Sequence, residues 1–390
     1  MKLIRFFKNP CNLYFLVWIV QIVHEPLEIY GNSVSVLVLF GLFVWSLYYL
    51  FITFLKYNVP PFLKVWTLLF VLFTIYAFIY MMFPPSGVAP SSTRRFLIEH
   101  WTSLLPIYPF FVFSMKKQLD RDVLRKWVIP FVVMGVINYY YGESYAYSLL
   151  EGAEVVGVTN NMGYSIAFVL PFLFFIKDKP IFQYVGVAVM LGYTFLALKR
   201  GAIVIAIIAT VFVLRDSVQT IKRNKKIIYC LFTIFIFAVY YFIQYQMSSN
   251  EYFLERVIQT QEGDTSARDD IYMDLIRYII NDMDVFQYIF GLGANGSKKA
   301  IGVEGHNDWL EIMVSMGIIG FYSFFLLWKR SLWQYKQITD KEKKLLFGIV
   351  VLMIFIRTFS SMAIRDIYIT STSILGFCLA SIAKKRTEYH

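Results

Sequence analysis

Long apolar runs separated by short polar stretches extend along the whole chain of 390 residues. There are about twelve of them, and a helix needs about 20 apolar residues to cross a bilayer of about 30 Å. The runs lack the alternation of apolar and polar positions typical of barrel strands, so helices are the spanning elements that remain. The predicted spans are residues 12–23, 33–55, 65–83, 101–115, 127–142, 162–176, 181–198, 202–214, 227–243, 307–328, 345–362 and 367–383. The pattern therefore predicts an all-α polytopic membrane protein.

One polar interruption, residues 244–306, is much longer than the others. This interruption divides the chain into three predicted parts: an N-terminal bundle of about nine transmembrane helices, a large loop, and about three C-terminal transmembrane helices. These three parts are residues 1–243, 244–306 and 307–390. The sequence shows no matching pair of broken helices in its two halves, the pattern that would favour a secondary transporter.

The middle of the large loop, Ser266 to Asp284, is predicted to be an amphipathic helix. Ser266 can cap its start, two acidic residues follow in the first turn, and apolar residues recur at helical spacing. The stretch Gly291–Gly296 comes next and reads G-x-G-x-x-G. That pattern binds dinucleotides only between a strand and a helix of a βαβ unit. We therefore interpret it as a turn and not as a nucleotide site.

Composition and charge agree with this topology. Apolar residues make up 58% of the chain and charged residues 16%, whereas soluble domains are nearer half apolar and a quarter charged. The formal net charge of +11 is concentrated in the connections 116–126, 215–226 and 329–344. Basic loops stay on the cytoplasmic side, so both termini are expected there, the large loop is expected outside, and nucleic acid is not an expected partner. The three cysteines have no metal-ligand or disulfide spacing, and we interpret them as packing residues.

Several basic residues remain on the outer side, against this trend. Lys199 and Arg200 form a tight outer hairpin between two apolar runs. Two cations at the membrane surface are costly unless an anion neutralises them. A diphosphate is a natural candidate, because a guanidinium binds phosphate oxygens bidentately. Arg268 begins the loop helix, where the helix dipole favours anions as well.

Two further arginines are candidates for substrate binding. Arg277 lies about two and a half turns after Arg268 on the loop helix, and it either contacts the substrate or pairs with Asp274 or Asn281. Arg357 is the single clear cation in its apolar run, toward the outer end. A charge at such a depth is a functional-site hypothesis by default.

The run from Gly305 to Glu311 returns the chain to the membrane, and His306 lies at the outer mouth of the helix that follows. A neutral imidazole there can accept a proton from a sugar hydroxyl. Glu304, Asp308 and Glu311 are its candidate orienting partners. The other three histidines lack such neighbours and are interpreted as structural: His24, His100 and His390.

Three blocks of this sequence resemble signatures of the bacterial O-antigen polymerase and O-antigen ligase superfamily. The block that closes the family's large periplasmic loop is similar to His306-Asn307, Leu310-Glu311, Gly317 and Gly320. The family's Ser-Arg-Gly-Ala hairpin is similar to Lys199-Arg200-Gly201-Ala202, with Lys199 in place of Ser. Its loop segment is similar to Ser266-Ala267-Arg268 through Phe290-Gly291-Leu292-Gly293. The resemblance covers roughly residues 190–330, in the same order and on the same side of the membrane.

The resemblance implies a metal-independent glycosyltransferase of the C-type architecture in the inner membrane, with an active site that faces the periplasm and needs no cofactor. Its donor would be an undecaprenyl-diphosphate-linked glycan. Arg200 and Arg268 match the family's diphosphate-binding arginines, and His306 matches its catalytic histidine. The remaining residues assigned to substrate binding are Lys199, Arg277, Arg357, Asn307 and Glu311.

The sequence leaves open which acceptor receives the glycan. A polymerase joins the growing chain to a new lipid-linked repeat, whereas a ligase joins it to lipid A core, and the compact chain favours the polymerase. A copolymerase that sets chain length is a further expected partner, besides membrane lipids. A lipid-glycan flippase would need ionisable residues near the bilayer midplane, and the spans are nearly bare of acids. A non-catalytic scaffold would not need Arg200, Arg268 and His306 on one face.

Overall fold

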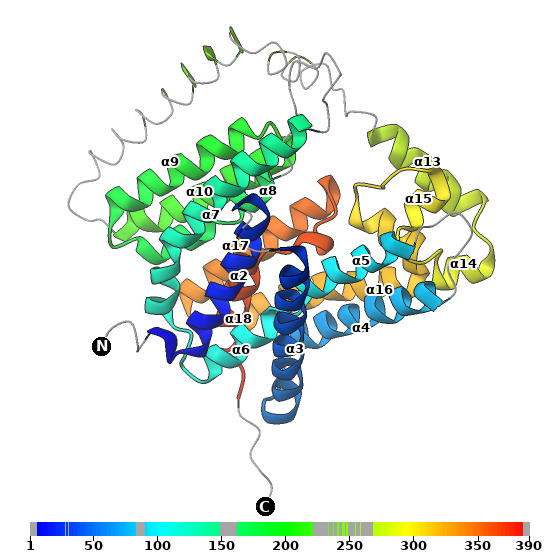
Figure 1. Ribbon diagram of the computed structural model, residues 1–390, viewed down its shortest axis with the longest axis horizontal. Coiled ribbons are helices and arrows are strands. Elements are labelled where there is room, and N and C mark those ends of the chain that lie inside the picture. Colours follow the sequence, from blue (N-terminus) through cyan, green and yellow to red (C-terminus); the bar gives the residue numbers. More distant parts are fainter. Residues whose placement is uncertain are drawn as a thin grey trace, which may run out of the picture. The chain divides into compact units, whose positions relative to one another are not determined.

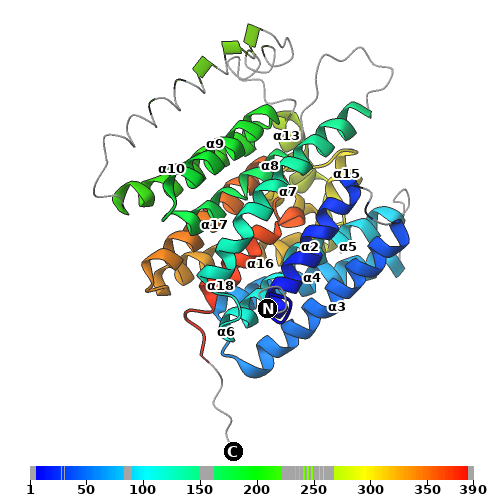
Figure 2. The same ribbon diagram turned by 60° about the vertical axis from the view of Figure 1, so that its left-hand side comes forward.

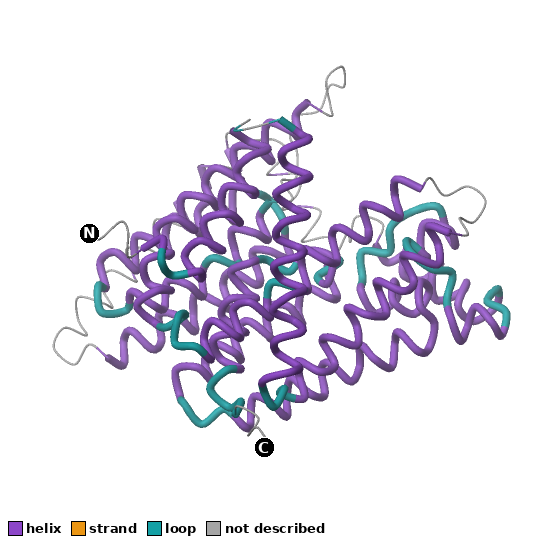
Figure 3. The backbone as a smooth tube through the Cα atoms, turned by 60° about the horizontal axis from the view of Figure 1, so that its bottom comes forward, coloured by secondary structure: helices purple, strands orange, loops and turns teal. Residues whose placement is uncertain are grey.

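The computed structural model describes residues 6–27, 29, 31–82, 90–148, 162–220 and 268–384, together with isolated positions between 233 and 258 (Figure 1). All regular elements in these ranges are helices, which confirms the predicted all-α class; Figure 3 shows them as helices joined by loops. In chain order they are α2 Pro10–Leu27, α3 Asn32–Lys56, α4 Pro61–Met82, α5 Pro90–Leu104, α6 Ile107–Met115, α7 Arg121–Ser148, α8 Gly163–Ala167, η1 Leu170–Ile176, α9 Pro180–Leu196, α10 Arg200–Thr220, α13 Arg268–Asn281, α14 Val285–Phe290, α15 Gly296–Ile301, α16 Asp308–Gln337, α17 Lys341–Ser360, η2 Ile364–Asp366 and α18 Ile369–Leu379.

Three of the described helices are long and apolar enough to cross a membrane, namely α3, α4 and α16. Shorter apolar helices occupy Pro10–His24, Gly163–Ile176, Pro180–Leu196 and Ile369–Leu379. Length and composition thus support a helical membrane protein. The predicted span 227–243 lies outside the described residues except for isolated positions.

The predicted span 101–115 is replaced by two helices. Helix α5 ends at Leu104, and the short α6 begins at Ile107 directly after Pro106. A proline has no amide hydrogen, and it disfavours helical backbone in the residue before it, so a helix ends here. Helix α5 also starts at Pro90, inside a stretch predicted to be an outer connection, because proline suits the first position of a helix.

The chain forms two compact units. The first comprises residues 1–18, 32–120 and 266–390, and the second comprises 19–31 and 121–265. In the first unit, α4 and α16 lie side by side, and so do α6 and α18 (Figure 1). A Cβ atom added at Gly376 of α18 would lie 2.7 Å from the backbone nitrogen of Phe111, so glycine lets the two helices approach closely.

In the second unit, α9 and α10 lie side by side against η1 (Figure 2). The side chain of Gln183 in α9 donates a hydrogen bond of 3.1 Å to the carbonyl oxygen of Leu173 in η1. Arg125 at the start of α7 pairs with Asp178 at 2.8 Å. These contacts fix the elements that lead to the Lys199-Arg200 hairpin.

Candidate functional site

His306 occupies the turn between α15 and α16 in a left-handed backbone conformation, with φ of 46°. A non-glycine residue there costs of order 1–3 kcal/mol and persists only where its surroundings fix it. Asn307 holds one side of this turn in place. Its side-chain oxygen accepts hydrogen bonds from the amides of Trp309 at 2.9 Å and Leu310 at 3.3 Å. Asn307 is therefore the N-cap of α16. Its predicted role in substrate binding stays a prediction.

Tyr272 of α13 fixes the other side of the turn. Its hydroxyl lies 3.2 Å from the carbonyl oxygen of His306 and 3.0 Å from that of Phe359, near the end of α17. Arg268 is the first residue of α13, four positions before Tyr272, so the two side chains lie on nearly the same face one turn apart. The structure thus brings the half-buried Arg268 to the helix end that contacts the half-buried His306.

Helix α13 itself matches the predicted loop helix, with ends at Arg268 and Asn281. Its predicted cap, Ser266, lies outside the described residues. Nine residues separate Arg277 from Arg268, which places Arg277 on the opposite face of the helix. It pairs with Asp274 at 3.3 Å, and both side chains are exposed. This ion pair is one of the alternatives expected for Arg277, and the predicted role of Arg277 in substrate binding stays a prediction.

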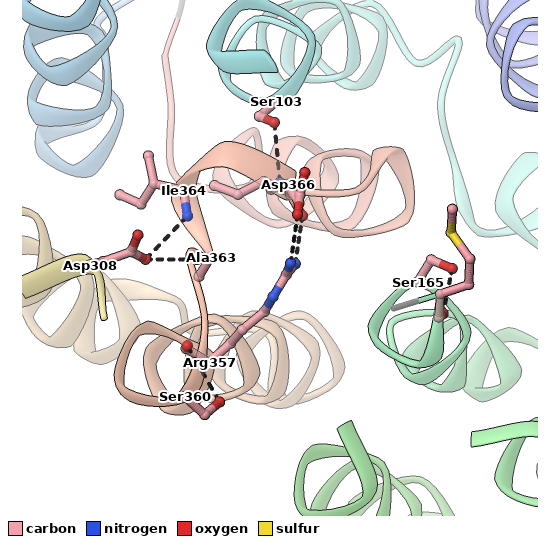
Figure 4. Close-up of polar contacts among 10 residues, drawn as sticks. Ser103, Ser165, Asp308, Arg357, Ser360, Ala363, Ile364 and Asp366 are labelled. Carbon is pink, nitrogen blue, oxygen red and sulfur yellow. Dashed lines mark hydrogen bonds and ion pairs between the residues drawn. The ribbon is translucent and has the colours of Figure 1, made fainter. Parts of the chain in front are cut away.

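The three carboxyl groups expected near His306 each have a partner of their own. Glu304 pairs with Lys298 at 2.8 Å. The buried Asp308 accepts hydrogen bonds from the amides of Ala363 and Ile364, which joins the start of α16 to the loop after α17 (Figure 4). Glu311 is also buried, and its Oε1 accepts a hydrogen bond of 2.7 Å from Ser315.

The glycine-rich stretch lies against a break in α16. Gly317 has φ of 60° and ψ of −159°, so the helix is interrupted there. In a continuous helix, the carbonyls of the preceding turn would accept amides from the following one. Here the carbonyls of Val314 and Ser315 accept the amides of Leu292 and Gly293, each at 2.7 Å. The interpretation of this stretch as a turn is confirmed, and its glycines permit the close backbone contact.

Gly291 and Gly296 also lie very close to the backbone of α16. A Cβ atom added at Gly291 would lie 2.3 Å from the backbone of Ser315, and one at Gly296 would lie 2.8 Å from it. Close packing also occurs at Gly317, since a Cβ atom there would lie 2.4 Å from the carbonyl oxygen of Ile289 in α14. The loop and α16 therefore fit together through backbone atoms.

Arg357 is buried at the C-terminal end of α17, with only 2% of its surface exposed. Its guanidinium lies 2.9 Å from the Asp366 carboxylate and donates a hydrogen bond of 2.8 Å to the carbonyl oxygen of the same residue (Figure 4). It also lies 5.2 Å from the centre of the Tyr368 ring. These contacts hold the loop between α17 and α18, and the substrate-binding role predicted for Arg357 remains a prediction.

Lys199 and Arg200 belong to the second unit, where they join α9 to α10 in a short turn. Leu198 adopts φ of 53° to make this turn, and both basic residues are half-buried. A Cβ atom added at Gly163 of α8 would lie 2.9 Å from Ala197 and 3.4 Å from the Cβ of Lys199. Glycine at position 163 therefore leaves room for the hairpin.

Two residues near the site received no functional role from the sequence. Tyr272 carries a polar group on an amphipathic helix four residues after Arg268, a signal that the sequence does contain. Lys299 donates a hydrogen bond of 2.7 Å to the carbonyl oxygen of Leu292 and lies 4.1 Å from the centre of the Tyr80 ring. Burial lowers the pKa of Lys299 to about 8, although Glu311 acts in the opposite direction.

Within the described ranges, no group of three or more His, Cys, Asp or Glu residues could hold a metal ion. Cys11 and Cys378 are buried free thiols. Comparisons with models of protein families and with curated proteins give no match to this chain. Function must therefore be argued from the site itself.

Proposed function

We propose that this chain is an inner-membrane glycosyltransferase that polymerises undecaprenyl-diphosphate-linked oligosaccharide repeats into surface polysaccharide such as O-antigen, capsule or exopolysaccharide. The observation that carries the proposal is the link between α13 and the re-entry turn. Arg268 stands one turn from Tyr272, whose hydroxyl contacts the backbone of His306. A cation at the start of α13 and a histidine in the turn that this helix contacts suit a reaction with an anionic leaving group and a hydroxyl nucleophile.

The proposed reaction is a direct displacement. The imidazole of His306 accepts the proton of the acceptor sugar hydroxyl while the hydroxyl oxygen attacks the anomeric carbon of the donor. The bond between that carbon and the diphosphate oxygen breaks, and the electron pair leaves with the lipid diphosphate. Arg268 stabilises the negative charge that develops, because a guanidinium group binds phosphate oxygens in a bidentate manner. For Arg200, the diphosphate-binding role implied by the resemblance stays a prediction.

The proposal includes more transmembrane helices than the three candidate spans found among the described residues. It has about twelve transmembrane helices in a C-type glycosyltransferase arrangement, with both termini in the cytoplasm and the 244–306 loop in the periplasm. The apolar helices α3, α4 and α16 and the shorter apolar helices support it, as does the concentration of basic residues in alternate connections. Cysteine accessibility labelling at the two termini and in the loop tests this topology.

The decisive assay is elongation of a lipid-linked repeat by purified protein. Replacing Arg268 with alanine should lower the rate by about 100-fold, the usual cost of losing one group that stabilises transition-state charge. Arg277→Ala is the matched control, since Arg277 lies on the same helix, faces away and is 68% exposed. It should retain nearly full activity. A folded Arg268→Ala protein that elongates at the normal rate would refute the mechanism.

The same residues would serve an O-antigen ligase, which uses the same donor. Supplying lipid A core as a second acceptor in the assay separates the two, because the ligase transfers glycan to it and the polymerase does not. A flippase is a different class. Deleting a polymerase gene should leave single repeats on the surface lipid, whereas deleting a flippase gene should leave none.

A further inference from the structure

A small cavity of about 20 Å³ lies beneath the re-entry turn, inside the first unit. Its polar side chains are His100 of α5 and Asp308, Glu311 and Ser315 of α16, and the rest of its wall is apolar. A water molecule needs about 10–15 Å³ of such space and two to four polar partners. The cavity therefore has room for a single water molecule and supplies the groups to hold it.

Glu311 has an oxygen that needs a partner. Only 6% of the residue is exposed, and its Oε2 has no hydrogen bond from the protein. The hydroxyl of Ser315 cannot serve both oxygens, because its single hydrogen is donated to Oε1 while its oxygen accepts the amide of Gly296. A Cβ atom added at Gly305 would lie 3.3 Å from Oε2, so the backbone closes that side. A buried carboxylate oxygen without a donor is costly.

The cavity also contains two acidic groups close together. Asp308 and Glu311 are three residues apart, so they share a side of α16. Arg357 attracts Asp308 and Lys299 attracts Glu311, although Arg357 also pairs with Asp366 and Lys299 also donates to a backbone carbonyl. Two carboxyl groups in one buried cavity resist being ionised together, because each disfavours the negative charge of the other and burial disfavours both charges.

A metal ion does not suit the site. Calcium takes six to eight oxygen ligands, and magnesium requires near-octahedral coordination. Only Asp308, Glu311 and Ser315 present side-chain oxygens to the cavity. Oδ2 of Asp308 already accepts two amides, and Ser315 already makes two hydrogen bonds. A proton and a water molecule need far fewer ligands.

We propose that this cavity is a proton-binding site in which Asp308, Glu311 and one buried water molecule share a single exchangeable proton, with the imidazole of His100 in the same wall. The water supplies the hydrogen-bond partner that Glu311 Oε2 lacks, and the proton reduces the charge of the pair to one. His100, interpreted from the sequence as structural, thereby acquires a place beside this site. The proposal does not depend on the transferase chemistry.

Infrared spectroscopy of the purified protein in detergent at neutral pH tests the proposal. An un-ionised carboxyl group gives a carbonyl stretching band that an ionised one lacks. Among the described residues, Asp308 and Glu311 are the buried acidic side chains. The band should be present in the wild-type protein and in the control Glu304→Gln, whose side chain is partly exposed and paired with Lys298. It should disappear in Glu311→Gln.

Asp308→Asn provides a second variant if Glu311→Gln does not fold, because the asparagine oxygen can still accept the two amides. It should abolish the band as well. A wild-type protein without the band overturns the proposal. So does a melting temperature that rises in sodium chloride relative to choline chloride in the wild type and not in Glu311→Gln, since the cavity would then bind a metal cation.

Discussion

The hydroxyl of Tyr272 lies 3.2 Å from the carbonyl oxygen of His306 and 3.0 Å from that of Phe359. One hydroxyl hydrogen therefore serves two acceptors, which belong to the re-entry turn and to α17. Together with the Asn307 cap, this contact explains how the turn keeps His306 at φ of 46°. Tyr272 acts as a positioning residue that joins the helix of Arg268 to the histidine.

Replacing Tyr272 with phenylalanine should reduce kcat of repeat elongation by about fivefold and leave KM for the lipid-linked donor nearly unchanged, because a lost hydrogen bond of about 1 kcal/mol frees the turn. Steady-state elongation kinetics measure both constants. Tyr278→Phe, on the same helix, is the control and should behave as the wild type. An unchanged kcat in Tyr272→Phe would show that the Asn307 cap alone is sufficient.

Replacing Gly317 with alanine should lower the free energy of unfolding by about 3 kcal/mol or more. Its backbone conformation is restricted almost to glycine, and the new Cβ would lie 2.4 Å from the carbonyl oxygen of Ile289. Gly302→Ala separates the two causes, because Gly302 has φ of 82° but no atom within 4 Å of an added Cβ. That variant should lose only about 1 kcal/mol. Thermal unfolding in detergent measures both, and equal losses would mean that the close contact is unimportant.

Replacing Arg357 with methionine should destabilise the protein by about 2 kcal/mol, because it leaves Asp366 without its cation and removes a hydrogen bond to the Asp366 carbonyl oxygen. The exposed pair formed by Arg277 and Asp274 gives the comparison, and Asp274→Asn should change stability by less than about 0.5 kcal/mol. If Arg357→Met instead keeps its stability and loses donor affinity, then Arg357 binds substrate, as the sequence predicted.

The stability of the wild-type protein relative to Lys299→Met should rise with pH between about 8 and 10.5. The folded protein releases the Lys299 proton near pH 8, whereas the unfolded chain keeps it up to about 10.5. Stability increases with pH wherever the unfolded state binds more protons. Below pH 8 the Lys299 amine is charged in both the folded and the unfolded protein, and burial of that charge destabilises the folded protein. Melting temperatures of the two proteins across this range give the difference, and a difference that falls with pH would be inconsistent with the buried amine.

Local sequence signals located the elements well. Helix α13 was predicted from acidic residues in its first turn and from apolar spacing, which are properties of the segment itself. The interruption at Pro106 is equally local, and the apolar composition of the run 101–115 concealed it. The candidate site was located in part, because His306 and Arg268 stand at element boundaries that the pattern of polar residues marks.

The contacts that involve distant segments could not be predicted in the same way. Nothing near Gly317 indicates that its helix is broken, because the amides that satisfy the break come from Leu292 and Gly293. The partner of Arg357 is Asp366, beyond the end of its helix. His100 and Asp308 line one cavity because α5 packs against α4 and η2, and α4 packs against α16. Such pairings require the tertiary arrangement.

The break in α16 has a consequence for how the protein is made. Carbonyl groups in a membrane must find donors within the protein. For Val314 and Ser315 those donors are amides some twenty residues earlier in the chain, which leave the ribosome first. The Gly291–Gly296 stretch thus completes the backbone hydrogen bonding of α16. Damage to the Gly291–Gly296 stretch should therefore appear first as failed membrane assembly, and only in surviving molecules as altered chemistry.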